Sequence, residues 1–213
     1  MMRTFGSLAF VTLFVALVAI STPVSAAGNF YATLSGGVAI MPDPEITDST
    51  LPGVTGEVGT EPGFSISGAF GYRYDKRFRG EVELAYREND IDRLSITAFG
   101  LGASGSASGD ISSFSGMVNG YWDISIDAPV KPYVGAGVGI SEIDAEISIG
   151  GTTAKSDDTV FAYQFMGGIL YEFSPEVDFH LGYRYFATAD PEFSTTESEY
   201  ETHNVEVGIT YKF

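Results

Sequence analysis

The sequence predicts an all-β fold, an eight-stranded antiparallel up-and-down transmembrane β-barrel. Three observations predict it. Apolar and polar residues alternate in eight segments, the chain opens with an export signal, and the connections between the segments alternate between short and long. Because side chains alternate faces along a strand, each segment has one apolar and one polar face. Such strands suit a barrel that turns its apolar face to lipid.

Residues 1–26 have the pattern of a secretory signal peptide. Arg3 supplies a positive start, Leu8–Ile20 is an apolar run, and Val24-Ser25-Ala26 fits a small-residue cleavage site, with Ala27 as the alternative last residue removed. The run falls short of the ~20 residues that a spanning helix needs. We therefore expect cleavage, which leaves 213 − 26 = 187 residues as one barrel domain, 27–213.

Composition excludes several classes of function. The chain has no cysteine, which removes disulfides, cysteine-bound zinc and thiol nucleophiles. Its net charge of −17, or −18 without Arg3, argues against a nucleic-acid partner. The glycine-rich segment Gly100–Gly109 lacks a following Lys-Ser/Thr, so we interpret it as a flexible loop rather than a phosphate cradle. We expect no cofactor and no metal site.

Each predicted strand reaches the ~9–11 residues with which a tilted strand crosses a bilayer. In order they are Asn29–Ile40, Gly63–Tyr74, Phe78–Arg87, Ser113–Ile124, Lys131–Ser141, Val160–Phe173, Val177–Phe186 and Asn204–Phe213.

Each strand is predicted because apolar residues recur at every second position and so form one apolar face. In the first four strands this face carries Phe30, Leu34 and Val38; Phe64, Ile66, Phe70 and Tyr72; Val82, Leu84 and Tyr86; and Phe114, Val118, Trp122 and Ile124. In the last four it carries Val134, Ala136, Val138 and Ile140; Phe161, Tyr163, Phe165, Ile169 and Tyr171; Phe179, Leu181, Tyr183 and Tyr185; and Val205, Val207, Ile209, Tyr211 and Phe213. The aromatic residues gather near the strand ends, which is typical of two interfacial girdles.

The opposite faces carry balanced charge. Six cations stand against six carboxylates, together with one histidine: Arg73, Arg79, Arg87, Lys131, Arg184 and Lys212; Glu81, Glu83, Asp123, Glu172, Asp178 and Glu206; and His180. Unpaired charges are costly inside a narrow barrel, so we predict an ion-pair network that lines the lumen. The small residues Gly135, Gly137 and Gly139 are interpreted as room for the large arginines opposite.

The connections divide the barrel into two ends. Three are short, at 75–77, 125–130 and 174–176, and four are long, at 41–62, 88–112, 142–159 and 187–201. The long connections hold nineteen acidic residues and two basic ones, Arg93 and Lys155. Since such barrels have short periplasmic turns and long outside loops, we predict four acidic loops on the cell exterior.

The chain resembles the family of eight-stranded outer-membrane barrels, which includes the outer-membrane protein A transmembrane domain, opacity-type adhesins and porin-like surface antigens. The resemblance rests on Lys131–Ile140, Leu181–Tyr185 and Val207–Phe213, and it extends over the whole mature chain. It implies that Val207, Ile209, Tyr211 and Phe213 form the signal read by the outer-membrane assembly machinery. The chain ends at Phe213, so we do not expect the cell-wall-binding domain of full-length outer-membrane protein A.

Three functions follow as hypotheses. The first is a structural or adhesive surface barrel that acts through its acidic loops, and the second is a narrow ion-conducting pore. The third, which we disfavour, is a lipid-modifying enzyme, because only His180 and His203 are present and no His-x-Ser motif accompanies them. In an intermediate hypothesis, the loop carboxylates bind divalent cations that also bind lipopolysaccharide phosphates. The sequence has no Asp-x-Asp-x-Asp-Gly loop, the motif of a tight calcium site.

The expected partners follow from the same placement. They are outer-membrane lipids including lipopolysaccharide, the outer-membrane assembly machinery with periplasmic chaperones, and a host or surface ligand. We expect no enzyme activity and a monomer in the outer membrane of a Gram-negative bacterium.

Overall fold

The computed structural model describes residues 29–42, 45–47, 54–98, 101–149, 152–189, 192–193, 196–197 and 200–213. The predicted signal peptide, 1–26, lies outside the described residues. The described chain contains twelve strands and no helix. They are β1 Phe30–Ile40, β2 Glu45–Thr47, β3 Val54–Thr60, β4 Gly63–Arg73, β5 Phe78–Ala98, β6 Leu101–Asp123, β7 Val130–Ile149, β8 Thr152–Glu172, β9 Val177–Thr188, β10 Glu192–Phe193, β11 Thr196–Glu197 and β12 Glu201–Lys212. Among these residues no helix is long and apolar enough to cross a membrane.

Eight of the strands close into an antiparallel barrel. Hydrogen bonds join them in the order β5-β4-β1-β12-β9-β8-β7-β6 and back to β5, while β2 and β3 extend the sheet at β5. Strands β1 and β12 form the closure, in which Leu34 lies opposite Ile209 and the Phe213 amide donates to the Phe30 carbonyl at 3.0 Å. The eight-stranded antiparallel barrel predicted from the sequence is confirmed.

The apolar faces point out of the barrel. Along β12, Val205, Val207, Ile209 and Tyr211 are exposed, whereas Asn204, Glu206 and Thr210 are buried. The same alternation holds on the other barrel strands, so exposed apolar side chains cover the exterior of the barrel and most of the inward side chains are polar. This is the period-two pattern on which the strand assignments rest.

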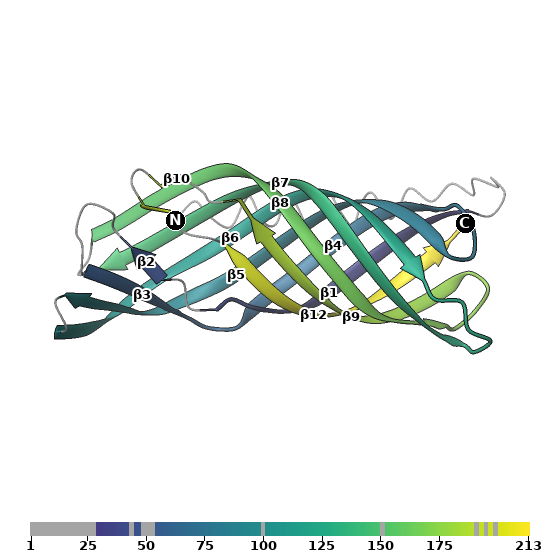
Figure 1. Cartoon of the computed structure of the whole chain (residues 1–213), viewed down its shortest axis with the longest axis horizontal. Helices are drawn as coiled ribbons and strands as arrows, with labels where there is room; N and C mark the ends of the chain where they lie inside the picture. Colours follow the sequence, from purple (N-terminus) through teal and green to yellow (C-terminus); the bar gives the residue numbers. More distant parts are fainter. Residues whose placement is uncertain are drawn as a thin grey trace.

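The two ends of the barrel differ in height (Figure 1). At one end, which we call the short-turn end, the connections after β4, β6 and β8 are short and the chain finishes at Phe213. At the other, the hairpin end, β5, β6, β7 and β8 run far beyond β1, β4, β9 and β12. With β2 and β3 they form what we call the projecting wall (45–47, 54–60, 88–98, 101–112, 142–149 and 152–159).

Three segments that were predicted as loops are mostly strand in the projecting wall. The connections 88–112 and 142–159 are mostly strand, because Glu88 pairs with Ser112 and Glu142 with Thr159 in the same register as the barrel below. Within the third, Gly100–Gly109, residues 101–109 belong to β6. The physical reason is alternation: a period-two pattern extends past the predicted end of β7, but its apolar residues are now on the face opposite to Ile140. They are Ile143, Ala145, Ile147 and Ile149.

The first and fourth long connections also contain strands. Strands β2 and β3 pair with each other, and β3 adds to β5. Strands β10 and β11 form a separate two-stranded sheet. The rest of these two connections lies partly outside the described residues.

Candidate functional site

The lumen is lined by one face of each barrel strand. Along β5, Arg79, Glu81, Glu83 and Arg87 are all buried, while Val82 and Leu84 between them are exposed to the outside. Almost every second residue over this stretch of β5 therefore brings a formal charge into an interior where water cannot solvate it. Such charges need partners within the barrel.

One cluster of charges lies toward the short-turn end. Arg79 donates to Glu81 at 2.8 Å and to Asp123 at 3.1 Å. Its guanidinium also lies over the Tyr121 ring, 3.9 Å from the centroid, with Tyr133 at 5.2 Å. A planar guanidinium suits both tasks, because it binds carboxylates at its edge and rings at its face.

A second cluster crosses the middle of the lumen. Arg184 on β9 donates to both carboxylate oxygens of Glu83 on β5, at 2.5 and 2.9 Å, and through Nε to Glu206 on β12 at 3.1 Å. Gln164 on β8 bridges this cluster, since it accepts from Arg184 at 3.0 Å and donates to Glu83 at 3.1 Å and to Asn119 at 2.7 Å. Strands β5, β6, β8, β9 and β12 are thereby cross-linked through the interior.

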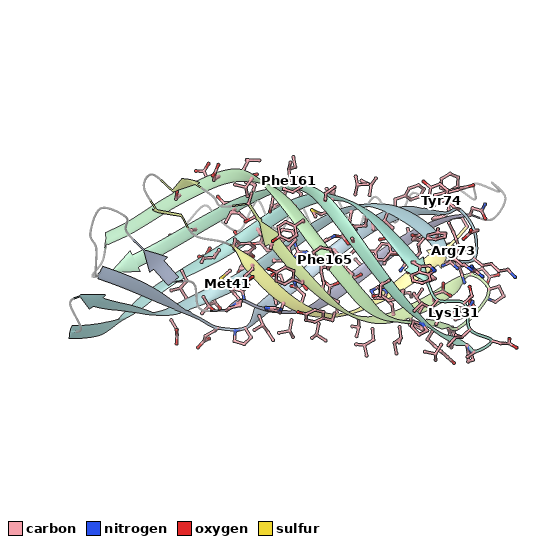
Figure 2. All side chains as sticks on the ribbon, viewed as in Figure 1. Met41, Arg73, Tyr74, Lys131, Phe161 and Phe165 are labelled. Carbon is pink, nitrogen blue, oxygen red and sulfur yellow. The ribbon has the colours of Figure 1, made fainter. Side chains whose placement is uncertain are left out.

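A third set of pairs lies at the short-turn end, where Figure 2 places Arg73, Tyr74 and Lys131. Lys212 donates to Asp178 at 2.7 Å, and Arg73 approaches the same carboxylate at 3.7 Å. Lys131 donates to Glu172 at 2.7 Å, but both side chains are partly exposed, 28% and 37%. The Lys131–Glu172 pair therefore belongs to the rim rather than to the lumen.

Two members of the predicted network have other neighbours. Arg87 is 1% exposed and has no carboxylate within ion-pair distance among the described residues; it donates to the Ser115 hydroxyl at 3.1 Å and lies 4.0 Å from the Phe186 ring centroid. His180 shares a hydrogen bond with Ser35 at 3.2 Å. We expected His180 to bind within the Asp178–Arg184 network, and the described hydrogen bonds place it with Ser35 instead.

An apolar layer lies in the lumen on the hairpin side of these clusters. Six buried residues make it: Met41, Met117, Ile143, Ala162, Phe186 and Tyr200. Between the two central charge clusters there remains a cavity of about 20 Å³, lined by residues that include Ser35, His180 and Tyr133. That volume holds about one water molecule, which needs roughly 10–15 Å³.

The glycines of β7 do not make room for arginines, as the sequence suggested. A Cβ on Gly135 would come within 2.5 Å of the Tyr121 ring, and one on Gly137 within 2.0 Å of Asn119 Oδ1. The bulky residues opposite these glycines are thus Tyr121 and Asn119 of the neighbouring strand β6.

Polar and aromatic side chains also meet on the outward face, at the hairpin end of β8, β9 and β12. The Tyr183 hydroxyl and His203 Nδ1 share a hydrogen bond of 2.5 Å, and Tyr185 donates to Glu201 at 2.7 Å. The His203 ring lies 5.4 Å from Tyr185 and 6.0 Å from Tyr183, and Tyr163 lies 6.4 Å from Tyr185. We call these five residues the Tyr–His patch.

The projecting wall carries carboxylates on its outward face. In the register of the strands Asp90 lies directly opposite Asp110, and Asp144 directly opposite Asp157. Inward neighbours such as Ile91 and Ile143 are buried. Within the described part of the chain no group of three or more acidic or histidine side chains is arranged to hold a metal ion.

The residues predicted as an assembly signal lie together on the outside of the closing strand. Val207, Ile209, Tyr211 and Phe213 are between 38% and 62% exposed. The rings of Tyr211 and Phe213 contact each other at 5.3 Å, and Phe213 reaches Phe70 at 6.4 Å.

Sequence reasoning missed the neutral residues of the lumen. Gln164 donates to Glu83, Asn119 accepts from Gln164, and Phe186 lies under Arg87, yet none of these side chains has a charge to attract notice. One signal was available. Met117, Ile143 and Phe186 are apolar residues on the polar face of their strands, and they mark the apolar layer.

Comparison with known proteins agrees with this architecture. The family model of the outer membrane protein beta-barrel domain matches residues 11–213. The chain is similar to an outer membrane protein of Gluconacetobacter diazotrophicus, 33% identical over 128 residues, which are 53% of this chain and 32% of that protein. It is also similar to major surface antigen 4 of Anaplasma marginale, 35% identical over 85 residues, which are 39% of this chain and 27% of that protein. The aligned segments thus span about a third or less of these two relatives.

Two solved structures share the fold. Neisserial surface protein A is 23% identical with a TM-score of 0.57, and the match covers 86% of this chain and 97% of that one. The outer membrane protein OprG of Pseudomonas aeruginosa is 13% identical with a TM-score of 0.62, covering 88% and 96%.

Proposed function

The chain belongs to the outer membrane protein beta-barrel domain family, and from that membership we propose that it is a surface barrel with a closed lumen, which acts structurally or adhesively through its acidic hairpin end. It is an outer-membrane β-barrel protein of the Gram-negative envelope. In such barrels the short turns face the periplasm and the long connections face outward. The hairpin end is therefore the extracellular end in this proposal.

The filled lumen is the observation that carries the proposal. The Arg184–Glu83–Glu206 cluster and the apolar layer around Phe186 succeed each other along the barrel axis. Eight strands leave an interior just wide enough for side chains to fill. The cavity among the charge clusters is about 20 Å³, room for about one water molecule, which favours a closed barrel over the narrow pore.

The outer surface supports a role outside the cell. The projecting wall extends well past the barrel and carries outward carboxylates such as Asp90, Asp144 and Asp157. One relative bears the name major surface antigen 4. A predominantly acidic wall favours cationic ligands and repels anionic ones, so we propose that any adhesive ligand presents basic groups.

Single-channel recording tests the closed lumen. The mature chain, refolded into a planar bilayer and verified as heat-modifiable on gels, should be silent. Recording the Glu83→Gln variant alongside shows whether the central cluster matters. A steady conductance in the unaltered chain that changes in Glu83→Gln would replace this proposal with the pore.

Adhesion measurements test the surface role. Cells that produce the full chain are compared with cells that produce the variant Asp90→Asn, Asp110→Asn, Asp144→Asn and Asp157→Asn, on amine-coated and carboxylate-coated glass. The unaltered chain should raise attachment to the amine surface, and the variant should lose this gain. Equal attachment of both strains to both surfaces would remove the adhesive role and leave a structural one.

Export and assembly complete the proposal. We propose that residues 1–26 are removed on export, which amino-terminal sequencing of the membrane-extracted protein tests. The strip Val207, Ile209, Tyr211 and Phe213 serves as the assembly signal, so Phe213→Ser should lower the amount of folded barrel in the outer membrane.

We propose no catalytic activity. Of the two histidines, His180 lies inside the closed lumen with Ser35, and His203 bonds to Tyr183. Neither has a carboxylate hydrogen-bond partner among the described residues, so the base–orienter pair of a hydrolase is not assembled.

A further inference from the structure

The hydrogen bonds of the Tyr–His patch use up most of its own donors. The Tyr185 hydroxyl donates to Glu201 at 2.7 Å, and the Tyr183 hydroxyl shares its hydrogen bond with His203 Nδ1. A carboxylate accepts several hydrogen bonds, so Glu201 keeps lone pairs for a ligand after it has accepted from Tyr185. The patch therefore presents ring faces and a carboxylate, which are electron-rich groups.

The rings of the patch form one continuous aromatic surface. Tyr185 is its central ring, 5.4 Å from the His203 ring and 6.4 Å from the Tyr163 ring. Tyr183 extends the surface on the other side of His203, at 6.0 Å, and is 47% exposed. The face of an aromatic ring is the negative end of its quadrupole and attracts a cation within about 6 Å of the centroid.

Strand register places a carboxylate beside this aromatic surface. Ala187 of β9 lies directly between Tyr163 of β8 and Glu201 of β12. Alternation turns Ala187 outward together with Tyr185, and its short side chain makes a low point between the larger ones. A flat group can rest on the Tyr185 ring while its edge reaches Glu201.

Charge around the patch selects a positive ligand. No Lys or Arg lies within ion-pair distance of Glu201 among the described residues. The connection 187–201, which the patch borders, contains five acidic residues and no Lys or Arg. An anionic group is repelled here, and a cationic group is attracted.

The patch extends to the rim of the barrel at its hairpin end. Strand β9 ends at Thr188 and β12 begins at Glu201, so Glu201 lies at the upper edge of the patch. Figure 2 shows Phe161 and Phe165, the outward neighbours of Tyr163 along β8. In the orientation proposed above, a ligand that approaches from outside the cell reaches Glu201 first and the tyrosine rings next.

We propose that the Tyr–His patch binds an arginine side chain of an extracellular basic peptide segment. The guanidinium lies flat on the Tyr185 ring, and its edge donates to the Glu201 carboxylate. Arginine fits both contacts, because its planar guanidinium stacks on rings and donates to carboxylates in a fixed fork. This inference rests on the proposed function, for which it names a point of contact with a basic ligand, and it is independent of whether the lumen conducts.

Peptide binding tests the site. The mature chain in maltoside micelles is titrated against a fluorescein-labelled tetra-arginine peptide, and anisotropy gives the affinity. Tyr185→Leu/Glu201→Gln, verified as heat-modifiable on gels, should weaken binding about fivefold or more. Tetra-lysine should bind the unaltered chain more weakly than tetra-arginine, because an ammonium group has no flat face to stack.

A matched control removes the same residue types at the other end of the barrel. Tyr171→Leu/Glu176→Gln changes an outward tyrosine of β8 and an exposed glutamate of the turn 174–176. At physiological ionic strength its affinity should stay within about twofold of that of the unaltered chain, because salt screens charges beyond about 8 Å. Equal losses in the two double variants would show that only net charge matters and would overturn the site.

Nuclear magnetic resonance of the unaltered chain tests the site without a variant at the patch. The protein has two histidines, so a single His180→Gln sample distinguishes the imidazole signals of His203 and His180. Tetra-arginine should shift the His203 signal and leave that of His180 in place, whereas tetra-glutamate should shift neither. A His203 signal that stays in place while amide signals of the projecting wall move would overturn the site alone. A moving His203 signal, with equal attachment of cells to both glass surfaces, would overturn the adhesive role alone.

Discussion

Arg184 donates to both carboxylate oxygens of Glu83 across the lumen, although the two residues are 101 positions apart in the chain. The pair joins β9 to β5 on opposite sides of the closure between β1 and β12. It is a cross-brace that forms only when β5 and β9 face each other across the lumen, whereas the second partner of Arg184, Glu206, lies on the neighbouring strand β12.

Replacement of Arg184 by leucine should therefore be among the most damaging single changes. It leaves Glu83 and Glu206 buried without their common cation, and loss of one partner of a buried ion pair costs about 3–5 kcal/mol. Urea unfolding in lipid vesicles, followed through the fluorescence of the single tryptophan, Trp122, measures the loss. Lys131→Leu at the half-exposed rim pair is the control, with an expected loss below about 1 kcal/mol. Equal losses in the two variants would show that the central brace adds nothing beyond a surface pair.

Removal of the Phe186 ring should destabilise the barrel through a different mechanism. Phe186→Ala opens a cavity in the apolar layer and removes the ring face beneath Arg87, with an expected loss of about 3–5 kcal/mol. Phe165→Ala is the matched change on the lipid face, where the ring is 57% exposed and lipid fills the vacated space. The same unfolding assay compares them, and a larger loss for Phe165→Ala would contradict an apolar plug at Phe186.

Two glycines on adjacent strands should respond oppositely to alanine. A Cβ on Gly139 of β7 would lie 2.0 Å from the Gly116 carbonyl oxygen, whereas one on Gly120 of β6 meets nothing within 4 Å. Gly139→Ala must shift the backbone and should cost about 1–3 kcal/mol. Gly120→Ala should be neutral or slightly stabilising, because alanine restricts the unfolded chain more than glycine. Folded fractions after refolding measure both, and an intolerant Gly120 would indicate that another molecule contacts that outward surface.

The stability of the first turn at the short-turn end, 75–77, should depend on pH. Asp75 accepts the backbone amides of Arg77 at 2.6 Å and Phe78 at 2.8 Å, and these hydrogen bonds lower the pKa of its carboxyl. A lowered folded-state pKa means that the contribution to stability is present above the unfolded pKa, about 3.9, and is lost as the pH falls through the folded value. Amide protection factors of Arg77 and Phe78 should drop at acidic pH in the unaltered chain and stay constant in Asp75→Asn. A constant protection factor in both the unaltered chain and the variant would show that the Asp75 carboxylate does not stabilise this turn.

The barrel could be predicted from the sequence because its strands obey a local rule. Alternation decides which of two faces each residue occupies, and residue order alone therefore places Arg184, Glu83 and Glu206 inside. It does not decide which inward residues meet, since pairing depends on strand tilt and on the stagger between strands. Arg87 illustrates the limit: its inward position follows from alternation, but its neighbours Ser115 and Phe186 depend on packing across the lumen.

The projecting wall shows a second limit. Polar, glycine-rich residues in 88–112 suggested loops, but the pairing of β5 with β6 continues upward from the barrel to Ala98 and Leu101, through a register shift between Ile91 and Arg93. The Tyr–His patch shows a third, because His203 and Tyr183 occupy different strands and meet only through the pairing of β9 with β12.

Because carboxylates face each other across the strands of the projecting wall, the stability of the wall depends on ionic strength. Asp90 opposes Asp110 and Asp144 opposes Asp157, and like charges directly across strands weaken a sheet. Dissolved salt shortens the reach of this repulsion from about 30 Å at 0.01 M to about 8 Å at physiological ionic strength. The pairing of strands in the projecting wall should consequently be more stable at high ionic strength and less stable at low ionic strength, while the barrel below it stays unchanged.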